Sequence, residues 1–262
     1  MHILADERGH LSYVVEGAGT PVVLVHAGIA DHRMWDAVAP ALAQSHTVIR
    51  YDLRGFGESA PPSGPFRETD DLLALLDHLG HDKVRLVGAS WGGRVALDFA
   101  LAHPERLHSL AVFSPPWRGY DWGAEMIAYD EAETKALEAG DLDTAVQVNL
   151  DMWLRGSARG WEDVAEGLAD LLREPLRISL VNQDTVGEHS QDPVGGELSA
   201  LNIPTLVGIG KLDAGDFQDI AARYANEIPG ADFVTFDNAA HLIALDAPAE
   251  LAAALGPFLA AD

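Results

Sequence analysis

Six short apolar runs recur along the chain. None of them alternates between apolar and polar residues, which is typical of strands buried on both faces of a parallel sheet. We therefore predict strands at residues 22–26, 47–51, 84–87, 110–113, 205–209 and 232–236. The run at 12–15 predicts an earlier antiparallel strand or two.

Helical patterns separate these runs, with apolar residues recurring at spacings of three and four. Strands that alternate with helices predict a doubly wound α/β sheet. Pro248 suits the first turn of the last helix. The predicted helices cover residues 31–43, 70–79, 90–102, 219–227 and 248–259.

One segment, 115–196, shows helical patterns without a convincing strand. We interpret it as a helical cap inserted over the carboxyl edge of the sheet. It follows the strand at 110–113, which is the sixth when two earlier antiparallel strands are counted. The remaining residues, 1–114 and 197–262, then form the core. The four helices predicted in the cap cover 124–139, 142–154, 161–173 and 176–184.

Composition narrows the classes of partner. The chain has 262 residues and no cysteine, which excludes disulfides, thiolate metal sites and a cysteine nucleophile. Its 17 basic and 41 acidic residues give a net charge of −24. So acidic a chain repels phosphate backbones and anionic lipid, so we expect neither nucleic acid nor membrane as a partner.

Targeting signals are not evident in the sequence. The N-terminal residues lack a basic start followed by an apolar run, and no apolar stretch reaches the ~18 residues of a bilayer span. We therefore expect a cytoplasmic protein. The sequence leaves the oligomeric state open, a homodimer included.

The clearest chemical motif is Gly88-Ala-Ser90-Trp-Gly92, which has the pattern G-x-S-x-G. A predicted strand leads into it and a predicted helix leads out of it, which is the context that a nucleophilic serine requires. Such a turn strains the serine backbone and places its hydroxyl at a helix N-terminus. Ser90 is therefore the candidate nucleophile.

A serine nucleophile needs a base, and the base needs an acid that orients it. His241 follows the last predicted strand and precedes the last helix, so it is the candidate base. Asp213 follows the strand at 205–209 and is the candidate acid, with Asp216 as its competitor. The chain order of nucleophile, acid and base matches that of α/β-hydrolases.

An oxyanion intermediate requires two hydrogen-bond donors. The backbone N–H of Trp91, next to the nucleophile, is one candidate. Gly28 is the other, with Ile29 as the alternative. For the substrate pocket we expect Ile29, Trp117, Trp122, Met126 and Leu242, although the aromatic residues of the cap can equally serve to dock its helices on the sheet.

The chain resembles the α/β-hydrolase superfamily over essentially its whole length. This resemblance implies an eight-stranded, mostly parallel sheet with a helical lid. It is closest to small members that include esterases, enol-lactonases and carbon–carbon bond hydrolases. The motifs that carry the resemblance are His26-Ala-Gly28, Tyr51-Asp-Leu-Arg54-Gly-Phe-Gly57-Glu-Ser59, Gly88-Ala-Ser90-Trp-Gly92-Gly93, Gly210-Lys-Leu-Asp213 and Ala240-His241 before Asp246-Ala-Pro248.

Departures from the family pattern limit what it implies. Ala27 stands where the family usually has glycine, which is tolerable unless the backbone needs a positive φ. Ser90 stands where dehalogenases and epoxide hydrolases carry aspartate, so those activities are disfavoured. The sequence also lacks the His-Gly-Gly-Pro-Gly run of proline iminopeptidases.

The expected function is hydrolysis of a small carboxylic ester or lactone through an acyl-enzyme, with no metal and no cofactor. The alternatives are carbon–carbon hydrolysis of a vinylogous diketone, perhydrolysis or acyl transfer by the same residues, and a ligand-binding module without catalysis. We expect Arg54 to fix a tight loop and not to bind a substrate carboxylate.

Overall fold

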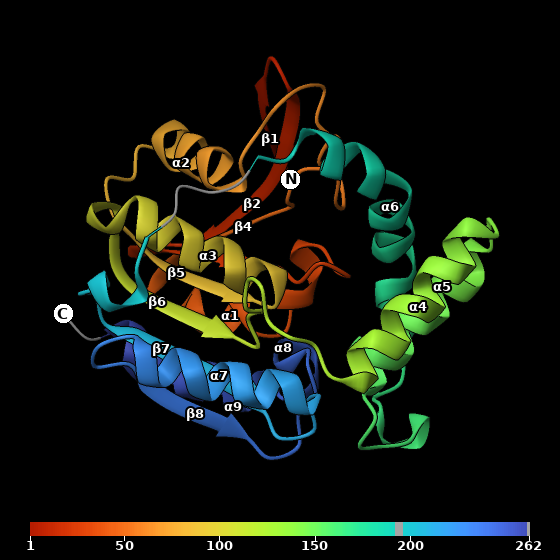
Figure 1. Ribbon diagram of the computed structural model, residues 1–262. Coiled ribbons are helices and arrows are strands. Elements are labelled where there is room, and N and C mark those ends of the chain that lie inside the picture. The colour runs from red at the N-terminus through yellow and green to blue at the C-terminus, as the bar shows by residue number, and fades with distance from the viewer. Residues whose placement is uncertain (192–195, 261–262) are drawn as a thin grey trace.

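The computed structural model describes residues 1–191 and 196–260 and is built on one sheet of eight strands (Figure 1). The strand order is β1-β2-β4-β3-β5-β6-β7-β8. The pairs β1·β2 and β2·β4 are antiparallel and the others are parallel, which confirms the predicted fold class. The strands are β1 (His2–Asp6), β2 (Gly9–Gly17), β3 (Thr20–Val25), β4 (His46–Tyr51), β5 (Val84–Ala89), β6 (Leu107–Phe113), β7 (Thr205–Gly210) and β8 (Asp232–Phe236).

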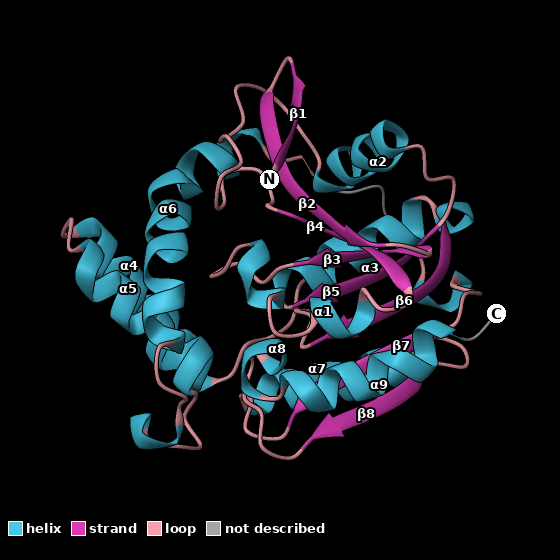
Figure 2. Ribbon diagram, turned by 180° about the vertical axis from the view of Figure 1, so that it is seen from behind, coloured by secondary structure: helices cyan, strands magenta, loops and turns pink. Residues whose placement is uncertain are grey.

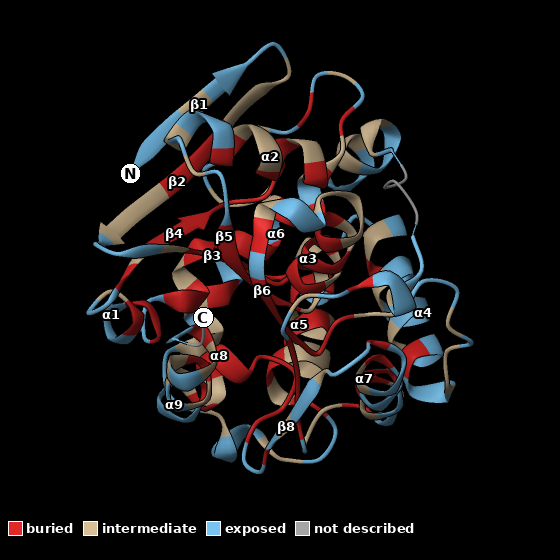
Figure 3. Cartoon of the chain, turned by 90° about the vertical axis from the view of Figure 1, so that its left-hand side faces the viewer, coloured by how far each residue is buried: buried red, intermediate tan, exposed pale blue. Residues whose placement is uncertain are grey.

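The central strands are buried on both faces of the sheet (Figure 3). In β3, Val22 and Leu24 belong to one apolar cluster, whereas Val23 and Val25 belong to the other. Successive side chains of a strand point to opposite faces, so a strand covered on both sides has apolar residues at every position. This is why the runs in the sequence do not alternate.

Helices cover both faces of the sheet (Figure 2). One apolar cluster takes residues from α1, α8 and α9, and the other takes residues from α2, α3 and α7. The sheet is therefore doubly wound. The helices are α1 (Ala39–Leu42), α2 (Glu68–Leu79), α3 (Trp91–Ala102), α7 (Gly215–Glu227), α8 (Ile243–Asp246) and α9 (Pro248–Ala260).

Between β6 and β7 lie the helices α4 (Ala124–Glu138), α5 (Leu142–Asn149) and α6 (Leu168–His189), which gather beside one end of the sheet (Figure 1). These helices lie in the segment that the sequence predicts to be a cap, and we keep that name for it. Its helix α6 is fastened to a core loop, where Asn182 Nδ2 donates to the carbonyl of Gly55 at 2.9 Å. At the last residue of α6, the carbonyl of His189 accepts the N–H of Phe66 at 3.0 Å.

The cap helices differ from the prediction in their bounds. The two helices expected at 161–173 and 176–184 are one helix, α6, that runs through Pro175 and is preceded by a short turn at Trp161–Asp163. Pro175 removes one hydrogen bond, but Leu172, Leu176 and Leu180 form a continuous buried face that keeps the helix intact. The helix expected at 142–154 is divided in two. Its first part, α5, ends at Asn149, and a π-helical turn follows at Leu150–Arg155.

The helix expected at 31–43 is also broken. A single 3₁₀ turn, His32–Trp35, is followed by the four residues of α1. Pro40 lies in the first turn of α1, where its missing N–H costs no hydrogen bond, and it cannot continue a helix from residue 36.

In the part of the chain that the structure describes, no helix is both long enough and apolar enough to cross a membrane. Even α6, with 22 residues, lacks the apolar content that a bilayer span needs.

Candidate active site

Ser90 lies in the turn between β5 and α3, in a backbone conformation that few residues other than glycine adopt. Its φ is 51° and its ψ is −119°. A Cβ on Gly88 would lie 2.2 Å from the carbonyl oxygen of Gly92, and a Cβ on Gly92 would lie 2.4 Å from that of Val25. Both glycines are therefore needed for the turn to close against β3 and to present Ser90 at the N-terminus of α3.

The Ser90 hydroxyl meets the ring of His241, which lies between β8 and α8. Ser90 Oγ is 2.7 Å from Nε2, and the carboxylate oxygens of Asp213 lie 3.0 and 2.9 Å from Nδ1. A carboxylate only accepts, so Nδ1 carries the ring proton and Nε2 is free to accept the hydroxyl proton. The side chains of His241 and Asp213 are each only 2% exposed. This arrangement can convert the serine into a nucleophile.

Asp216, the competing acid, lies away from the imidazole. Its Oδ2 accepts the backbone N–H of Gly123 at 2.9 Å. Gly123 directly precedes α4, whereas Asp216 belongs to α7. Asp216 therefore ties the start of the cap to the core, and Asp213 is the carboxylate that the structure places against His241.

His26 fixes the turn that follows β3. Its Nε2 accepts the N–H of Leu53 at 2.9 Å, so its Nδ1 is protonated and donates to the carbonyl of Ala27 at 2.8 Å. Burial lowers the pKa of His26, which keeps the ring neutral and makes this tautomer persistent. The ring thus joins the turn after β3 to the loop after β4.

The turn held by His26 contains Gly28 and Ile29, the two alternatives for the second oxyanion donor. Ala27 donates its N–H to Sδ of Met34 at 3.2 Å, and Ala30 donates its N–H to the carbonyl of Ala27 at 3.0 Å. Among the described residues, no acceptor takes the N–H groups of Gly28 and Ile29. A Cβ on Gly28 would be 3.4 Å from Cβ of Trp91, so the turn lies next to the other predicted donor. Both N–H groups are therefore free to serve as the second donor.

Ala27 fits its position although the family usually has glycine there. Among the described residues other than glycine, only Ser90 and Ser114 have a positive φ. Ala27 is 1% exposed and needs no left-handed conformation.

A cavity of about 600 Å³ opens over Ser90 and His241. Most of its wall is apolar or aromatic, and it lies between the loops of the core and the helices of the cap. Three of the predicted pocket residues, Ile29, Trp122 and Met126, line it together with the candidate oxyanion residues. The full lining is Ala27, Gly28, Ile29, Phe56, Ser90, Trp91, Pro116, Trp122, Met126, Tyr129, Glu133, Asn149, Trp153, Leu176, Ser179, Leu180, Gln183, Val186, Gly187, Ser190, Phe217 and His241.

Two other predicted pocket residues, Trp117 and Leu242, are not among the residues that line this cavity. The Trp117 ring lies 4.7 Å from that of Tyr224, and the Arg223 guanidinium lies 3.7 Å from the centre of the Trp117 ring. Trp117 therefore docks the start of the cap on α7. Leu242 is fully buried in the apolar cluster that includes α8 and α9. Proximity to His241 in sequence does not turn its side chain towards the cavity.

Two aromatic rings that we did not predict enclose the imidazole. The ring centres of Trp153 and Phe217 each lie 4.6 Å from that of His241. Trp153 comes from the cap and Phe217 from α7. They shield the Ser90–His241 contact from solvent, which strengthens its electrostatics. No local sequence signal marks either residue, because both act across long chain separations.

A buried ion pair holds the loop that carries His241. One oxygen of Asp246 accepts the backbone N–H of Ala240 at 2.8 Å, and both accept from Nη2 of Arg159 at 2.8 Å. Burial raises the pKa of Asp246, and the hydrogen bond from Arg159 opposes this. Arg159 also donates to the carbonyls of Leu154 and Arg155. The pair therefore connects the cap to the residue before His241.

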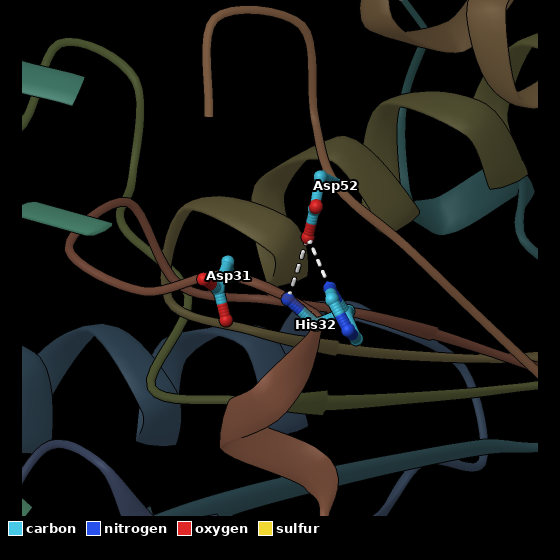
Figure 4. Close-up of side chains that lie close together, drawn as sticks. All are labelled: Asp31, His32 and Asp52. Atoms are coloured by element: carbon cyan, nitrogen blue, oxygen red, sulfur yellow. Dashed lines mark hydrogen bonds and ion pairs between the residues drawn. The ribbon is translucent and has the colours of Figure 1, made fainter. Parts of the chain in front are cut away.

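Asp31, His32 and Asp52 form a buried cluster beside this site (Figure 4). Asp52 Oδ1 accepts from both the backbone N–H and Nδ1 of His32, each at 2.8 Å. Asp31 instead holds Arg33, with contacts from 2.7 to 3.0 Å. These polar groups join the loops after β3 and β4, so we interpret the cluster as structural and not as a metal site.

Arg54 faces away from the cavity. Its guanidinium donates to both oxygens of Asp71, at 2.7 and 2.9 Å, and to Asp6 at 3.0 Å. The side chain is 1% exposed. Arg54 therefore fixes its loop, as expected from the sequence.

The comparisons with known proteins agree with the fold. A family model described as alpha/beta hydrolase fold matches residues 20–137. The chain is 30% identical over 205 residues to a pimeloyl-[acyl-carrier protein] methyl ester esterase of Aeromonas hydrophila, covering 76% of this chain and 79% of that protein. A hydrolase structure from Pseudomonas aeruginosa superposes with a TM-score of 0.82 at 28% identity, covering 99% of this chain and 98% of that one.

Another relative matches over a shorter region. A soluble epoxide hydrolase of Corynebacterium is 40% identical over 105 residues. The match covers 39% of this chain and spans 37% of the length of that protein.

The ion pair between cap and loop leads to a first prediction. Changing Arg159→Met leaves a buried carboxylate unpaired, so we expect a loss of about 3 kcal/mol in the free energy of unfolding. We also expect the downfield proton resonance of the His241 Nδ1–H to broaden or shift. Chemical denaturation and proton NMR measure the two effects. Arg173→Met, which removes an exposed pair with Asp170, is the matched control. Equal behaviour of the two variants would contradict the assigned role.

The His32–Asp52 contact leads to a second prediction. Burial lowers the pKa of His32, but the hydrogen bond and charge of Asp52 outweigh it and raise the pKa above its ordinary value. The stabilisation that His32 adds is therefore complete below the unfolded-state pKa of about 6.5 and is lost as the pH rises through the folded-state pKa. The difference in unfolding free energy between wild type and His32→Gln should therefore become smaller as the pH rises through that window. A difference that grows with pH would show that the sign is wrong.

Proposed function

We propose that this protein, which belongs to the α/β-hydrolase family, cleaves a carboxylic ester or lactone through Ser90, His241 and Asp213. The observation that carries the proposal is the continuous hydrogen-bonded path from Ser90 Oγ through His241 to Asp213. An arrangement of this kind is what serine acyl transfer requires.

In the proposed reaction, Ser90 Oγ attacks the carbonyl carbon while Nε2 of His241 accepts its proton. Asp213 keeps the imidazole in the correct tautomer and stabilises the imidazolium that forms. The N–H of Trp91 and that of Gly28 or Ile29 stabilise the oxyanion. His241 then donates its proton to the leaving alcohol. Water, activated by the same imidazole, releases the acid from Ser90, so no step draws on a metal or an organic cofactor.

The cavity supports a substrate of moderate size with an apolar acyl or alcohol part. Its volume of about 600 Å³ is in the range of small-molecule sites. Trp122, Trp153 and Phe217 offer large apolar surfaces close to His241. An acyl chain placed against them would lose contact with water while its carbonyl reaches Ser90.

Carbon–carbon hydrolysis is less well supported. The dienol acid that such an enzyme cleaves carries a carboxylate, which calls for a basic side chain or paired polar donors in the pocket. Among the described residues lining the cavity there is no lysine or arginine, and Glu133 contributes a negative charge. Epoxide hydrolysis is disfavoured because Ser90 occupies the position of the expected aspartate.

The proposal predicts hydrolysis of p-nitrophenyl esters in a series from acetate to decanoate. Ser90→Ala and His241→Ala should each lower turnover by a factor on the order of 10⁶, since the residues act as a unit. Asp213→Asn should lower it by about 10⁴, because it favours the wrong tautomer. The measurement is the initial rate of nitrophenolate release.

Ser179→Ala is the matched control for this series. Ser179 lines the same cavity, but its hydroxyl donates to the carbonyl of Leu176 at 2.9 Å and does not contact His241. We expect its turnover to stay close to that of the wild type. Equal rates for Ser90→Ala and the wild type would rule out the mechanism.

A further inference from the structure

One polar cluster interrupts the apolar wall that the cap contributes to the cavity. Tyr129 and Glu133 lie one turn apart on α4, and Asn149 ends α5. The Tyr129 hydroxyl is 3.1 Å from Oε1 of Glu133 and 2.8 Å from Oδ1 of Asn149. Asn149 Nδ2 donates to the same Glu133 oxygen and to the carbonyl of Ala145. All three of these side chains line the cavity.

The cluster has more acceptors than donors. The Tyr129 hydroxyl carries one hydrogen and the Asn149 amide carries two, one of which goes to Ala145. Burial first and then the charge of Glu133 raise the pKa of Tyr129, so its hydroxyl stays protonated but still supplies a single hydrogen. The carboxylate of Glu133 and the carbonyl of Asn149 together can accept several. The cluster is therefore satisfied best when a ligand brings a further donor.

The charge around the cluster points the same way. No lysine or arginine occurs among the described residues that line the cavity. The chain as a whole carries a net charge of −24. A second carboxylate brought into this apolar space would meet Glu133 without a compensating cation, which is unfavourable at low dielectric. A hydroxyl or an ammonium group would meet an acceptor.

The cluster lies within reach of a molecule bound at Ser90. Trp153 links the two regions, because its ring centre is 5.1 Å from that of Tyr129 and 4.6 Å from that of His241. A substrate whose carbonyl sits at Ser90 would pass Trp153 with an apolar segment and bring its far end to Glu133.

We infer that Tyr129, Glu133 and Asn149 form a specificity subsite that binds a hydrogen-bond-donating group, a hydroxyl or an ammonium, at the end of the substrate remote from the scissile carbonyl. This inference rests on the proposed function for the position of the carbonyl. The preferred substrate is then an ester or lactone with an apolar segment and a terminal donor. Substrates that end in a carboxylate bind more weakly.

The competing interpretation is that the cluster only joins α4 to α5. The Asn149 bond to Ala145 and its near-complete burial fit such a role as well. The two interpretations differ in one respect: a purely structural cluster has no effect on which ligand binds. Ligand selectivity, and not stability, is therefore the property to measure.

Binding to Ser90→Ala tests the inference without turnover. The probes are methyl hexanoate, its ω-hydroxy, ω-amino and ω-carboxy derivatives, and the corresponding octanoate series. Quenching of tryptophan fluorescence measures the dissociation constant of each probe. We expect the ω-hydroxy and ω-amino esters to bind about tenfold more tightly than the unsubstituted ester of at least one length, and the ω-carboxy ester more weakly. Glu133→Gln in the same background should remove the ω-amino preference, reduce the ω-hydroxy preference and admit the ω-carboxy ester. Tyr129→Phe, which keeps the carboxylate, should retain the ω-amino preference.

Glu131→Gln is the matched control, because it removes an exposed carboxylate from the same helix. It should leave all binding ratios unchanged. The inference is overturned if the unsubstituted and ω-hydroxy esters bind equally, if the ω-carboxy ester binds as well as they do, or if Glu133→Gln keeps the wild-type ratios. Wild-type hydrolysis of the unsubstituted esters, measured separately, decides the proposed function. A failure of one is thus distinguishable from a failure of the other.

Discussion

The site depends on the strained backbone of Ser90. A residue with a side chain rarely holds a φ of 51°, so the surrounding structure must hold it there. Gly88 lets the end of β5 approach α3, and Gly92 lets α3 approach β3, so closely that any Cβ would overlap a backbone carbonyl. The N–H of Ser90 also donates to the carbonyl of Phe113 at 2.8 Å, which ties the turn to the end of β6. The burial of three adjacent strands is what sustains the strain, so the hydroxyl is positioned before any substrate arrives.

The other parts of the site reach Ser90 because parallel strands end at one edge. The turn of Gly28 follows β3, Asp213 follows β7 and His241 follows β8. The cap is attached to the core by two polar contacts: a half-buried hydrogen bond between Gly123 and Asp216 of α7, and the buried ion pair between Arg159 and Asp246 of α8. The cavity is therefore bounded by two layers that share hydrogen bonds, and the cap is linked directly to the loop of the imidazole.

The sequence was informative where the determinants are local. Buried strands, the turn around Ser90 and the placement of Asp213 and His241 after strands depend on neighbours along the chain, and the structure brings those side chains together. The bounds of the cap and the catalytic roles of these residues stay predictions. Trp117 and Leu242 were placed wrongly because the direction of a side chain depends on tertiary packing. Trp153 and Phe217 were missed for the same reason. The continuous α6 shows a buried leucine face outweighing the local effect of Pro175.

In the proposed reaction, chemistry and selection lie on different elements of this molecule. The proposed nucleophile, base and acid come from core loops, whereas Tyr129, Glu133 and Asn149 come from α4 and α5. Because Ser90, His241 and Asp213 are held by the sheet edge, the three polar residues of this cluster can change without moving the reacting atoms. Trp153 is the exception, since its ring touches both His241 and Tyr129. The same side chain is part of the wall that shields the imidazole and, in the proposed binding mode, part of the path that a substrate takes towards Glu133. A change in its size would therefore alter the shielding of His241 and the width of that path at the same time.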